Sequence, residues 1–196
     1  MEKIILLTAI LSIFLSLTAK DLSKYDYLLE PQISEKSTIP VLQYTAVGDP
    51  SVSSNEAFSS LYPAFFKLKR KFKLELQPSR ARWPISHHTP REEWIGRFCL
   101  PINDRLTDIP EKISKKYPKL EISSWEYGTV AEILHLGSYA EETPTIEQLH
   151  QFITDSGYEI VGAHEEEYLK GPGMFGKGNP DKYRTIIRYQ VREIEK

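Results

Sequence analysis

Residues 143–169 read TPTIEQLHQFITDSGYEIVGAHEEEYL, and this stretch predicts a helix followed by a strand. Proline is well tolerated at the first helical positions, so Thr143-Pro144-Thr145 predicts the start of the helix. Gly157 predicts its end, because glycine is favoured just after a helix C-terminus. Three apolar residues recur at helical spacing and predict the buried face of this helix: Ile146, Leu149 and Ile153.

The residues on either side of this helix predict further strands. Residues 122–139 favour extended chain and are interrupted near Gly128, which leaves open one long strand or a hairpin. Residues 158–169 and 183–192 predict the closing strands of the chain. The second half therefore has the order strand, helix, strand, strand.

The first half repeats this order. Residues 39–47 predict a strand that ends at Gly48-Asp49-Pro50, where glycine and proline favour a turn. A helix is expected from a cap at Ser54 or Asn55 to about residue 72, with a kink at Pro63. Its apolar stripe comprises five residues: Phe58, Leu61, Tyr62, Phe65 and Leu68.

Two strands are expected after this helix, at residues 76–85 and 94–101, followed by an exposed helix at 108–117. The repeated order predicts an α+β fold made of two pseudo-repeated strand-helix-strand-strand halves. We expect an antiparallel sheet and a central ligand cleft where the two halves meet.

The N-terminus has the pattern of an export signal. A short charged start is followed by an apolar run, which predicts a signal peptide over residues 1–19 or an uncleaved membrane anchor there. Residues 20–38 are polar and without clear period, which is typical of a spacer. The folded domain is then expected over residues 39–196, in an exported (periplasmic or secreted) protein.

Composition excludes several classes of protein. The formal net charge is -2, which argues against a nucleic-acid binder. The single cysteine, Cys99, lies in a predicted strand and is interpreted as a buried structural thiol, since no internal disulfide can form. Adjacent histidines on extended chain point apart, so His87-His88 does not predict a metal site. No metal and no cofactor is expected.

An ordered set of motifs resembles a known family. The segments are EILHLGSY from Glu132, TPTIEQLHQFI from Thr143, HEEEYL from His164 and RTIIRYQV from Arg184. They resemble the C-terminal half of GyrI-like domains, which are also called effector-binding or SOUL-like domains. The first half agrees in the order of Gly48-Asp49-Pro50, Leu61-Tyr62, Trp83 and Trp94.

The resemblance implies a small organic ligand as partner. Members of this family serve as sensors of hydrophobic cations in transcription regulators, and stand-alone members hydrolyse strained cyclopropanoid compounds. In both groups a glutamate of the His-x-Glu-x-Tyr-Leu segment faces an aromatic cleft, which implies this place for Glu166 and Tyr168. Glu165 stands where the family often has histidine, and the usual acidic-Pro-Arg turn after Tyr-Leu is missing. No DNA-binding helix-turn-helix is seen before the domain.

Strand alternation independently groups three residues of this segment. His164, Glu166 and Tyr168 should share one face of a strand, with Glu165 and Glu167 on the other. Because unpaired buried charges are costly, two interpretations remain open. The strand is either a solvated edge, or only Glu166 faces a cleft.

Other candidate residues are ligand-binding or structural. Trp83 and Trp94 are expected either to wall the cleft or to pack in the core. Tyr139 is expected on the strand face of His135 and could meet the ligand. His135 and His150 are interpreted as structural imidazoles, and residues 170–182 as a lid.

Three functions follow from these residues. We expect first a ligand-binding protein, with Glu166, Tyr168, His164, Trp83, Trp94 and Tyr139 around a hydrophobic, cationic molecule. The alternative is a hydrolase of reactive small molecules, in which Glu166 has a raised pKa and acts with Tyr168. The third is an interaction protein whose cleft is filled by its own side chains. A membrane is expected as a partner only through an uncleaved N-terminus.

Overall fold

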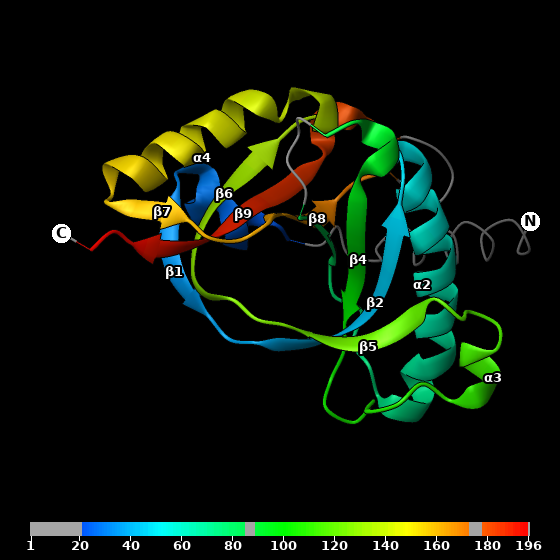
Figure 1. Cartoon of the computed structure of the whole chain (residues 1–196). Helices are drawn as coiled ribbons and strands as arrows, with labels where there is room; N and C mark the ends of the chain where they lie inside the picture. Colours follow the sequence, from blue (N-terminus) through cyan, green and yellow to red (C-terminus); the bar gives the residue numbers. More distant parts are fainter. Residues whose placement is uncertain (1–20, 85–88, 173–177, 196) are drawn as a thin grey trace, which may run out of the picture.

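The computed structural model describes residues 21–84, 89–172 and 178–195, and within them an antiparallel sheet organises the molecule (Figure 1). The order of the paired strands is β1-β6-β9-β8-β3-β4-β2-β5, and β7 pairs with β9. The strand bounds are β1 Gln32–Lys36, β2 Ile39–Val47, β3 Ser79–Trp83, β4 Ile95–Pro101, β5 Leu120–Trp125, β6 Gly128–Leu136, β7 Tyr158–Ile160, β8 His164–Lys170 and β9 Arg184–Glu193.

The sheet confirms the predicted pair of similar halves. In the first half β2 pairs with β4 and β4 with β3, and in the second half β6 pairs with β9 and β9 with β8. The halves meet where β3 pairs with β8. The interruption near Gly128 separates β5 from β6, which pair with different strands and not as a hairpin.

Three α-helices and four short 3-10 helices connect the described strands. Their bounds are η1 Ser23–Leu29, α2 Pro50–Phe72, η2 Arg91–Glu93, α3 Glu111–Ser114, η3 Tyr139–Glu141, α4 Thr143–Asp155 and η4 Pro180–Lys182. The start of α4 agrees with the prediction from Thr143-Pro144, and Gly157 adopts a positive φ of 80° after its end. The helix expected at 108–117 is limited to the four residues of α3.

Helix α2 begins earlier than predicted. Asp49 is its N-cap, and the side chain of Asp49 accepts a hydrogen bond of 2.8 Å from the backbone N–H of Ser51. Pro50 then occupies the first helical position, where its missing N–H costs nothing. Gly48-Asp49-Pro50 therefore works as a helix start as well as a turn, and Ser54 and Asn55 lie inside the helix.

Both long helices cover the same face of the sheet (Figure 1). We call this the helix face. Residues of α2 pack there on β2 and β4, and residues of α4 pack on β6 and β9. The first core centres on Leu61, Phe65 and Phe98, which are fully buried. Strands β3 and β8 lie between these two cores, at the centre of the sheet.

Residues 21–38, which fall in the spacer predicted over 20–38, belong to the fold, and this corrects the predicted boundary at residue 39. Strand β1 pairs with β6 through five residue pairs, and Leu28 of η1 is fully buried. Leu28 packs with Leu134, Leu169 and Ile186 on the face of the sheet opposite the helices. The polar composition of β1 suits an edge strand, where one side faces solvent, and this hid it in the sequence.

The predicted signal or anchor at 1–19 and the pair His87-His88 lie outside the described residues, as do residues 173–177 of the expected lid. Within the described part of the chain, no helix has the length and apolar character needed to cross a membrane.

Candidate functional site

The register of the central strands brings the predicted site residues together. On β8, Glu166 lies opposite Ala81 of β3 and Ile187 of β9, both of which are buried among the cores of the helix face. Trp83 is the partner of His164 in the same register. Because side chains alternate along β8, His164, Glu166 and Tyr168 all project to the helix face, between α2 and α4.

The carboxylate of Glu166 accepts hydrogen bonds from the side chains around it. The indole N–H of Trp83 donates to Oε1 at 3.2 Å, and the hydroxyl of Tyr168 donates to Oε2 at 2.6 Å. Nε2 of His164 lies 3.1 Å from Oε1, and Nδ1 of His164 lies 2.7 Å from the hydroxyl of Tyr189. A proton on Nε2 lets His164 donate to Glu166, and Nδ1 pairs with the hydroxyl of Tyr189.

These contacts hold Glu166 as an anion. Burial raises the pKa of a carboxyl group, but the hydrogen bonds and charge of His164 and the hydroxyl and indole donors lower the pKa of Glu166 below its ordinary value. The raised pKa expected for a catalytic Glu166 is therefore wrong. Burial and the charge of Glu166 raise the pKa of Tyr168 well above its ordinary value, so its hydroxyl stays protonated. The side chain of Glu166 remains 13% exposed.

Aromatic rings surround this carboxylate. Trp83 packs on Trp94 with ring centroids 5.9 Å apart and edge-on against Phe98 at 5.3 Å. The indole N–H of Trp94 donates to the carbonyl of Thr89 at 2.8 Å, so Trp94 supports Trp83 and does not contact Glu166 through a hydrogen bond. From α2, Phe58 meets Tyr168 edge-on at 6.2 Å. Trp83 and Trp94 are half-buried, as cleft walls would be.

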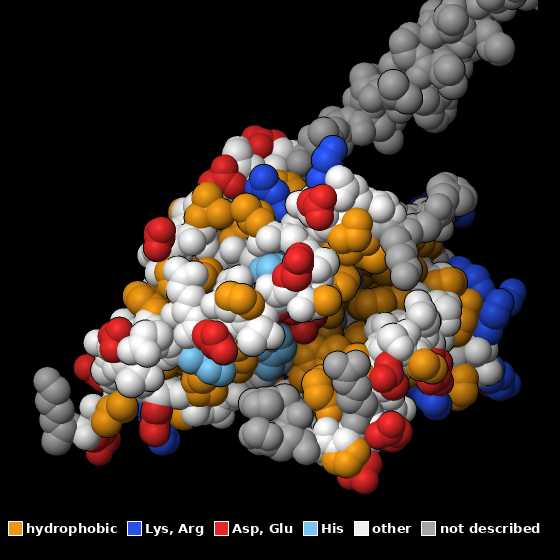
Figure 2. Space-filling model, turned by 90° about the horizontal axis from the view of Figure 1, so that it is seen from above, with side chains coloured by type: hydrophobic (Ala, Val, Ile, Leu, Met, Phe, Trp, Pro, Cys, Tyr) orange, Lys and Arg blue, Asp and Glu red, His pale blue; other side chains and the backbone are white. Residues whose placement is uncertain are grey.

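Figure 2 shows the molecule from above the view of Figure 1, with hydrophobic side chains gathered in a hollow and histidine side chains beside it. Partial exposure of the rings agrees with such a hollow, since Phe58, Tyr62 and Tyr168 are only partly buried against the first core. Phe58 and Tyr62 belong to the apolar stripe of α2, and Tyr168 meets them from β8.

Tyr139 reaches the site from η3, beyond the end of β6, and not from the strand face of His135 as predicted. Its ring lies 5.6 Å from that of Tyr168, and it is 38% exposed. A Cβ atom at Gly171 would lie 2.5 Å from the hydroxyl of Tyr139, so glycine is needed there for this close approach.

The solvated-edge interpretation of the three adjacent acids is wrong, and of the three only Glu166 projects to the helix face. Strand β8 is central, and Glu165 and Glu167 are buried on the face opposite the helices. Arg188 contacts Glu165 at 2.5 Å and Glu167 at 3.1 Å, and Arg82 contacts Glu165 at 2.7 Å. Arginines from neighbouring strands compensate these charges, which could not be read from β8 alone.

The structure adds Glu142, which the sequence analysis missed. Glu142 lies between η3 and α4 with 6% of its surface exposed, and its Oε1 is buried without a hydrogen-bond partner. Burial and the nearby charge of Glu166 raise the pKa of Glu142 to about 9. A glutamate just before Thr143-Pro144 resembles an ordinary exposed residue at a helix start, so only its burial reveals it.

Glu142, His164 and Glu166 have possible ligand atoms that all lie within 4.8 Å of one another. Both ring nitrogens of His164 are already in hydrogen bonds, with Glu166 and Tyr189. A metal ion at His164 would have to break one of them. The cluster is thus built as a hydrogen-bonded group around Glu166.

The remaining candidates are structural or exposed. His135 is buried, and its ring nitrogens contact the hydroxyl of Thr145 at 2.9 Å and the carbonyl of Ser138 at 3.1 Å, as expected of a structural imidazole. His150 is exposed on α4, with its ring 4.9 Å from that of Tyr189, so it is not a core residue. Cys99 is fully buried, as predicted, and burial raises the pKa of its thiol.

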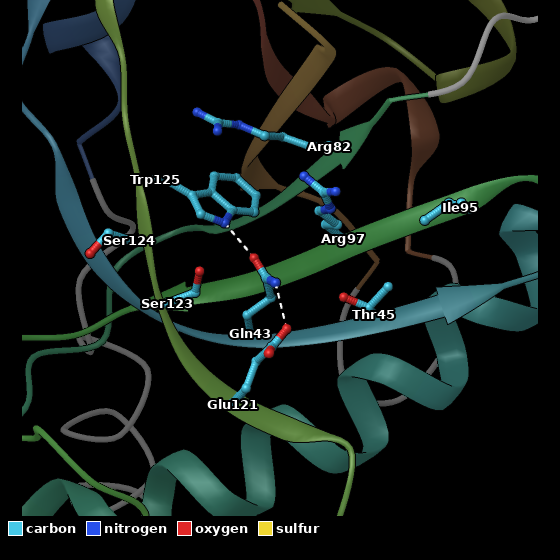
Figure 3. Close-up of a pocket in the computed structure, with 9 residues that line it drawn as sticks. All are labelled: Gln43, Thr45, Arg82, Ile95, Arg97, Glu121, Ser123, Ser124 and Trp125. Atoms are coloured by element: carbon cyan, nitrogen blue, oxygen red, sulfur yellow. Dashed lines mark hydrogen bonds between the residues drawn. The ribbon is translucent and has the colours of Figure 1, made fainter.

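A second pocket, of about 400 Å³, lies on the face opposite the helices (Figure 3). Its lining is polar apart from Ile95 and Trp125. Gln43 is fixed in it, accepting from the indole N–H of Trp125 at 2.6 Å and donating to Glu121 at 2.8 Å. None of the predicted ligand-binding residues lines this pocket.

No protein-family model and no curated protein matches the chain. Solved structures do. An uncharacterized conserved protein from Listeria innocua is similar with a TM-score of 0.72 and 24% identity, over 84% of this chain and 93% of that one. A hydrolase from Listeria innocua has a TM-score of 0.70 and 23% identity, over 87% and 96% of the two chains.

The C-terminal domain of EcmrR is similar with a TM-score of 0.64 and 16% identity, over 84% of this chain and 98% of that domain. At these identities the likeness shows the fold alone. The chain therefore has the fold of these proteins.

Proposed function

We propose that this protein binds a hydrophobic organic cation in the hollow around Glu166. The observation that carries the proposal is the charge of Glu166, which no arginine or lysine of the described residues compensates. Its described side-chain partners are Trp83, Tyr168 and His164. A largely buried anion that is held by hydrogen-bond donors among rings, with no arginine or lysine beside it, is complementary to a cation with apolar substituents.

The other buried glutamates of the sheet provide the contrast. Glu132 pairs with Arg188 at 2.8 Å and with Lys36 at 3.0 Å, and Glu167 pairs with Arg188 and Arg80. The charges of these glutamates are compensated by arginine and lysine side chains of the sheet. A carboxylate has about four acceptor sites, and the three donors to Glu166 leave it one for a ligand.

The rings supply the remaining attraction. Trp83, Tyr168 and Tyr139 present faces and edges around the carboxylate, and each cation–π contact contributes about 0.5–2 kcal/mol. The phenyl groups of a hydrophobic cation would also bury apolar surface against Phe58 and Tyr62, at roughly 25 cal/mol per Å².

Two probes of equal shape and opposite charge test this proposal. We expect tetraphenylphosphonium to bind, followed by quenching of tryptophan fluorescence, and tetraphenylborate to bind far more weakly. Glu166→Gln should weaken tetraphenylphosphonium binding about 10- to 100-fold, the worth of a contact to a charged group. Glu159→Gln, an exposed change of equal charge, is the control. Equal binding of both probes would reject charge selection, and binding of neither would favour a scaffold role.

A hydrolase is the second candidate, favoured by the 2.6 Å hydrogen bond between Tyr168 and Glu166 beside the rings. Such a pair could take a proton from water and return one to a leaving group. The fold neighbour described as a hydrolase agrees with this candidate. The test is incubation with an electrophilic cyclopropanoid compound and a search by mass spectrometry for addition of one water, lost in both Glu166→Gln and Tyr168→Phe.

We further propose that the apolar run before residue 20 directs export, which places the site outside the cytoplasm. Fractionation of cells that express the full chain, with mass measurement of the exported form, tests this and shows whether the run is cleaved.

A further inference from the structure

Glu142 is a buried carboxyl group whose Oε1 makes no hydrogen bond within the described fold. It is 6% exposed, Oε1 has no hydrogen-bond partner, and the side chain does not cap α4 although it stands at the N-cap. One of its carboxyl oxygens lies within 4.8 Å of a carboxyl oxygen of Glu166 and of a ring nitrogen of His164. An unpartnered polar atom at this place points toward the ligand site.

Two carboxyl groups this close cannot both ionise easily in a buried environment. Glu166 has three donors and keeps its charge, whereas Glu142 has none and keeps its proton; burial and then the charge of Glu166 raise the pKa of Glu142 to about 9. The other titratable groups facing the pair are His164 and Tyr168 of β8, Tyr139 of η3 and Tyr189 of β9. No arginine or lysine of the described residues pairs with Glu142.

We propose that Glu142 is a second ligand-facing carboxyl group, which releases its proton when a cation occupies the hollow, so that cation binding and proton release are coupled. This rests on the proposed function. The carboxyl O–H bond of Glu142 breaks, the proton passes to solvent, and the new carboxylate faces the ligand. The cation removes the repulsion from Glu166 that had kept the proton in place.

The coupling has a definite sign and window. An opposite charge within ~4–6 Å lowers a carboxyl pKa by about 1–3 units, so the bound state should hold the proton of Glu142 less tightly by this amount. A cation that releases a proton binds more tightly as pH rises. The dissociation constant for a monocation should therefore fall, by up to about tenfold per pH unit, between about pH 7 and 9. A dication should release a larger share of the proton.

The tyrosines cannot produce this effect at pH 8. Burial raises the pKa of Tyr139, Tyr168 and Tyr189 beyond their ordinary values, so they keep their protons there. Proton release that is present in the unchanged protein and absent in Glu142→Gln is therefore specific to Glu142.

The experiment is calorimetric titration of the full protein with tetraphenylphosphonium at about pH 8, in two buffers of different ionisation enthalpy. The difference in binding enthalpy gives the number of protons exchanged. We expect the unchanged protein to release roughly half a proton or more. Glu142→Gln should still bind and release none. Glu141→Gln, the exposed neighbour, should behave like the unchanged protein.

The possible outcomes distinguish the inference from the proposed function. Binding without proton release, or the same release in Glu142→Gln, overturns the inference and leaves the proposed function standing. Failure of tetraphenylphosphonium to bind at any pH overturns the proposed function, and the inference with it. Should Glu142→Gln not fold, the pH dependence of the dissociation constant in the unchanged protein decides: a constant value between about pH 7 and 9 contradicts the coupling.

Discussion

Glu142 and Glu166 have the same side chain and opposite protonation because one has donors and the other has none. The same contrast limits what the sequence could reveal about the site. Glu166, Tyr168 and His164 follow from alternation on one strand, together with the family resemblance. Glu142 joins them through the fold of η3 onto the sheet, and no local pattern marks a buried acid at a helix start.

The pH dependence of stability should reveal Glu142 without any ligand. Its pKa of about 9 in the folded state lies above the unfolded value of about 4.3. Stability that is present below pH 4.3 is therefore lost progressively as pH rises toward 9. In urea melts Glu142→Gln should gain on the unchanged protein by up to about 1.4 kcal/mol per pH unit in this window. A difference that does not vary between pH 5 and 8 would contradict the assignment.

At the scale of elements, periodicity predicted most strands and both long helices, since α2 and α4 have clear apolar stripes. Two predictions failed because a local signal had two uses. Gly48-Asp49-Pro50 was interpreted only as a turn, although Asp49 also caps α2. The solvated edge that the acids of β8 suggest is wrong, because arginines of β3 and β9 lie across from Glu165 and Glu167.

The corrected start of α2 predicts where a cap substitution matters. Asp49→Ala should cost about 1 kcal/mol in the free energy of unfolding, because it removes the acceptor for the N–H of Ser51. Asn55→Ala, at the cap position expected from sequence, should change stability by less than about 0.5 kcal/mol. Denaturant melts measure the free energy of unfolding of both variants. A larger loss for Asn55→Ala would favour the later helix start expected from the sequence.

At the scale of the molecule, a network of buried charges joins the strands of the second half behind the site, and Arg80 and Arg82 of β3 connect it to the first half. Arg188 of β9 contacts Glu132 of β6 and Glu165 and Glu167 of β8. Arg188→Met should destabilise the fold by about 3–5 kcal/mol, because it leaves buried carboxylates without a partner. Arg192→Met on the same strand removes an exposed pair with Glu159 and should cost less than about 1 kcal/mol. Urea melts at neutral pH distinguish them; equal losses would mean that the network is not needed.

Residues 21–36, at the start of the described chain, belong to the fold as much as its last strand does. A chain that begins at residue 38 lacks η1 and β1, which exposes the edge of β6 and removes the buried Leu28. Loss of Leu28 alone should cost about 2–5 kcal/mol. We expect this shortened chain to be less stable than one beginning at residue 21 and to aggregate through the free edge, measured by thermal melts and light scattering. Equal stability of the two chains would mean that the residues before 38 act only as a spacer.

The two faces of β8 have unlike surroundings: aromatic rings on the helix face and arginines on the opposite face. Insertion of a single residue into β8 would move each side chain to the opposite face. One acid would still reach the arginines and another would still reach the rings, because Glu165, Glu166 and Glu167 are consecutive. Histidine and tyrosine would leave the hollow. The acidic triplet therefore lets the fold tolerate a one-residue shift along β8 that would remove the candidate ligand site. Related chains could keep the architecture after losing ligand recognition.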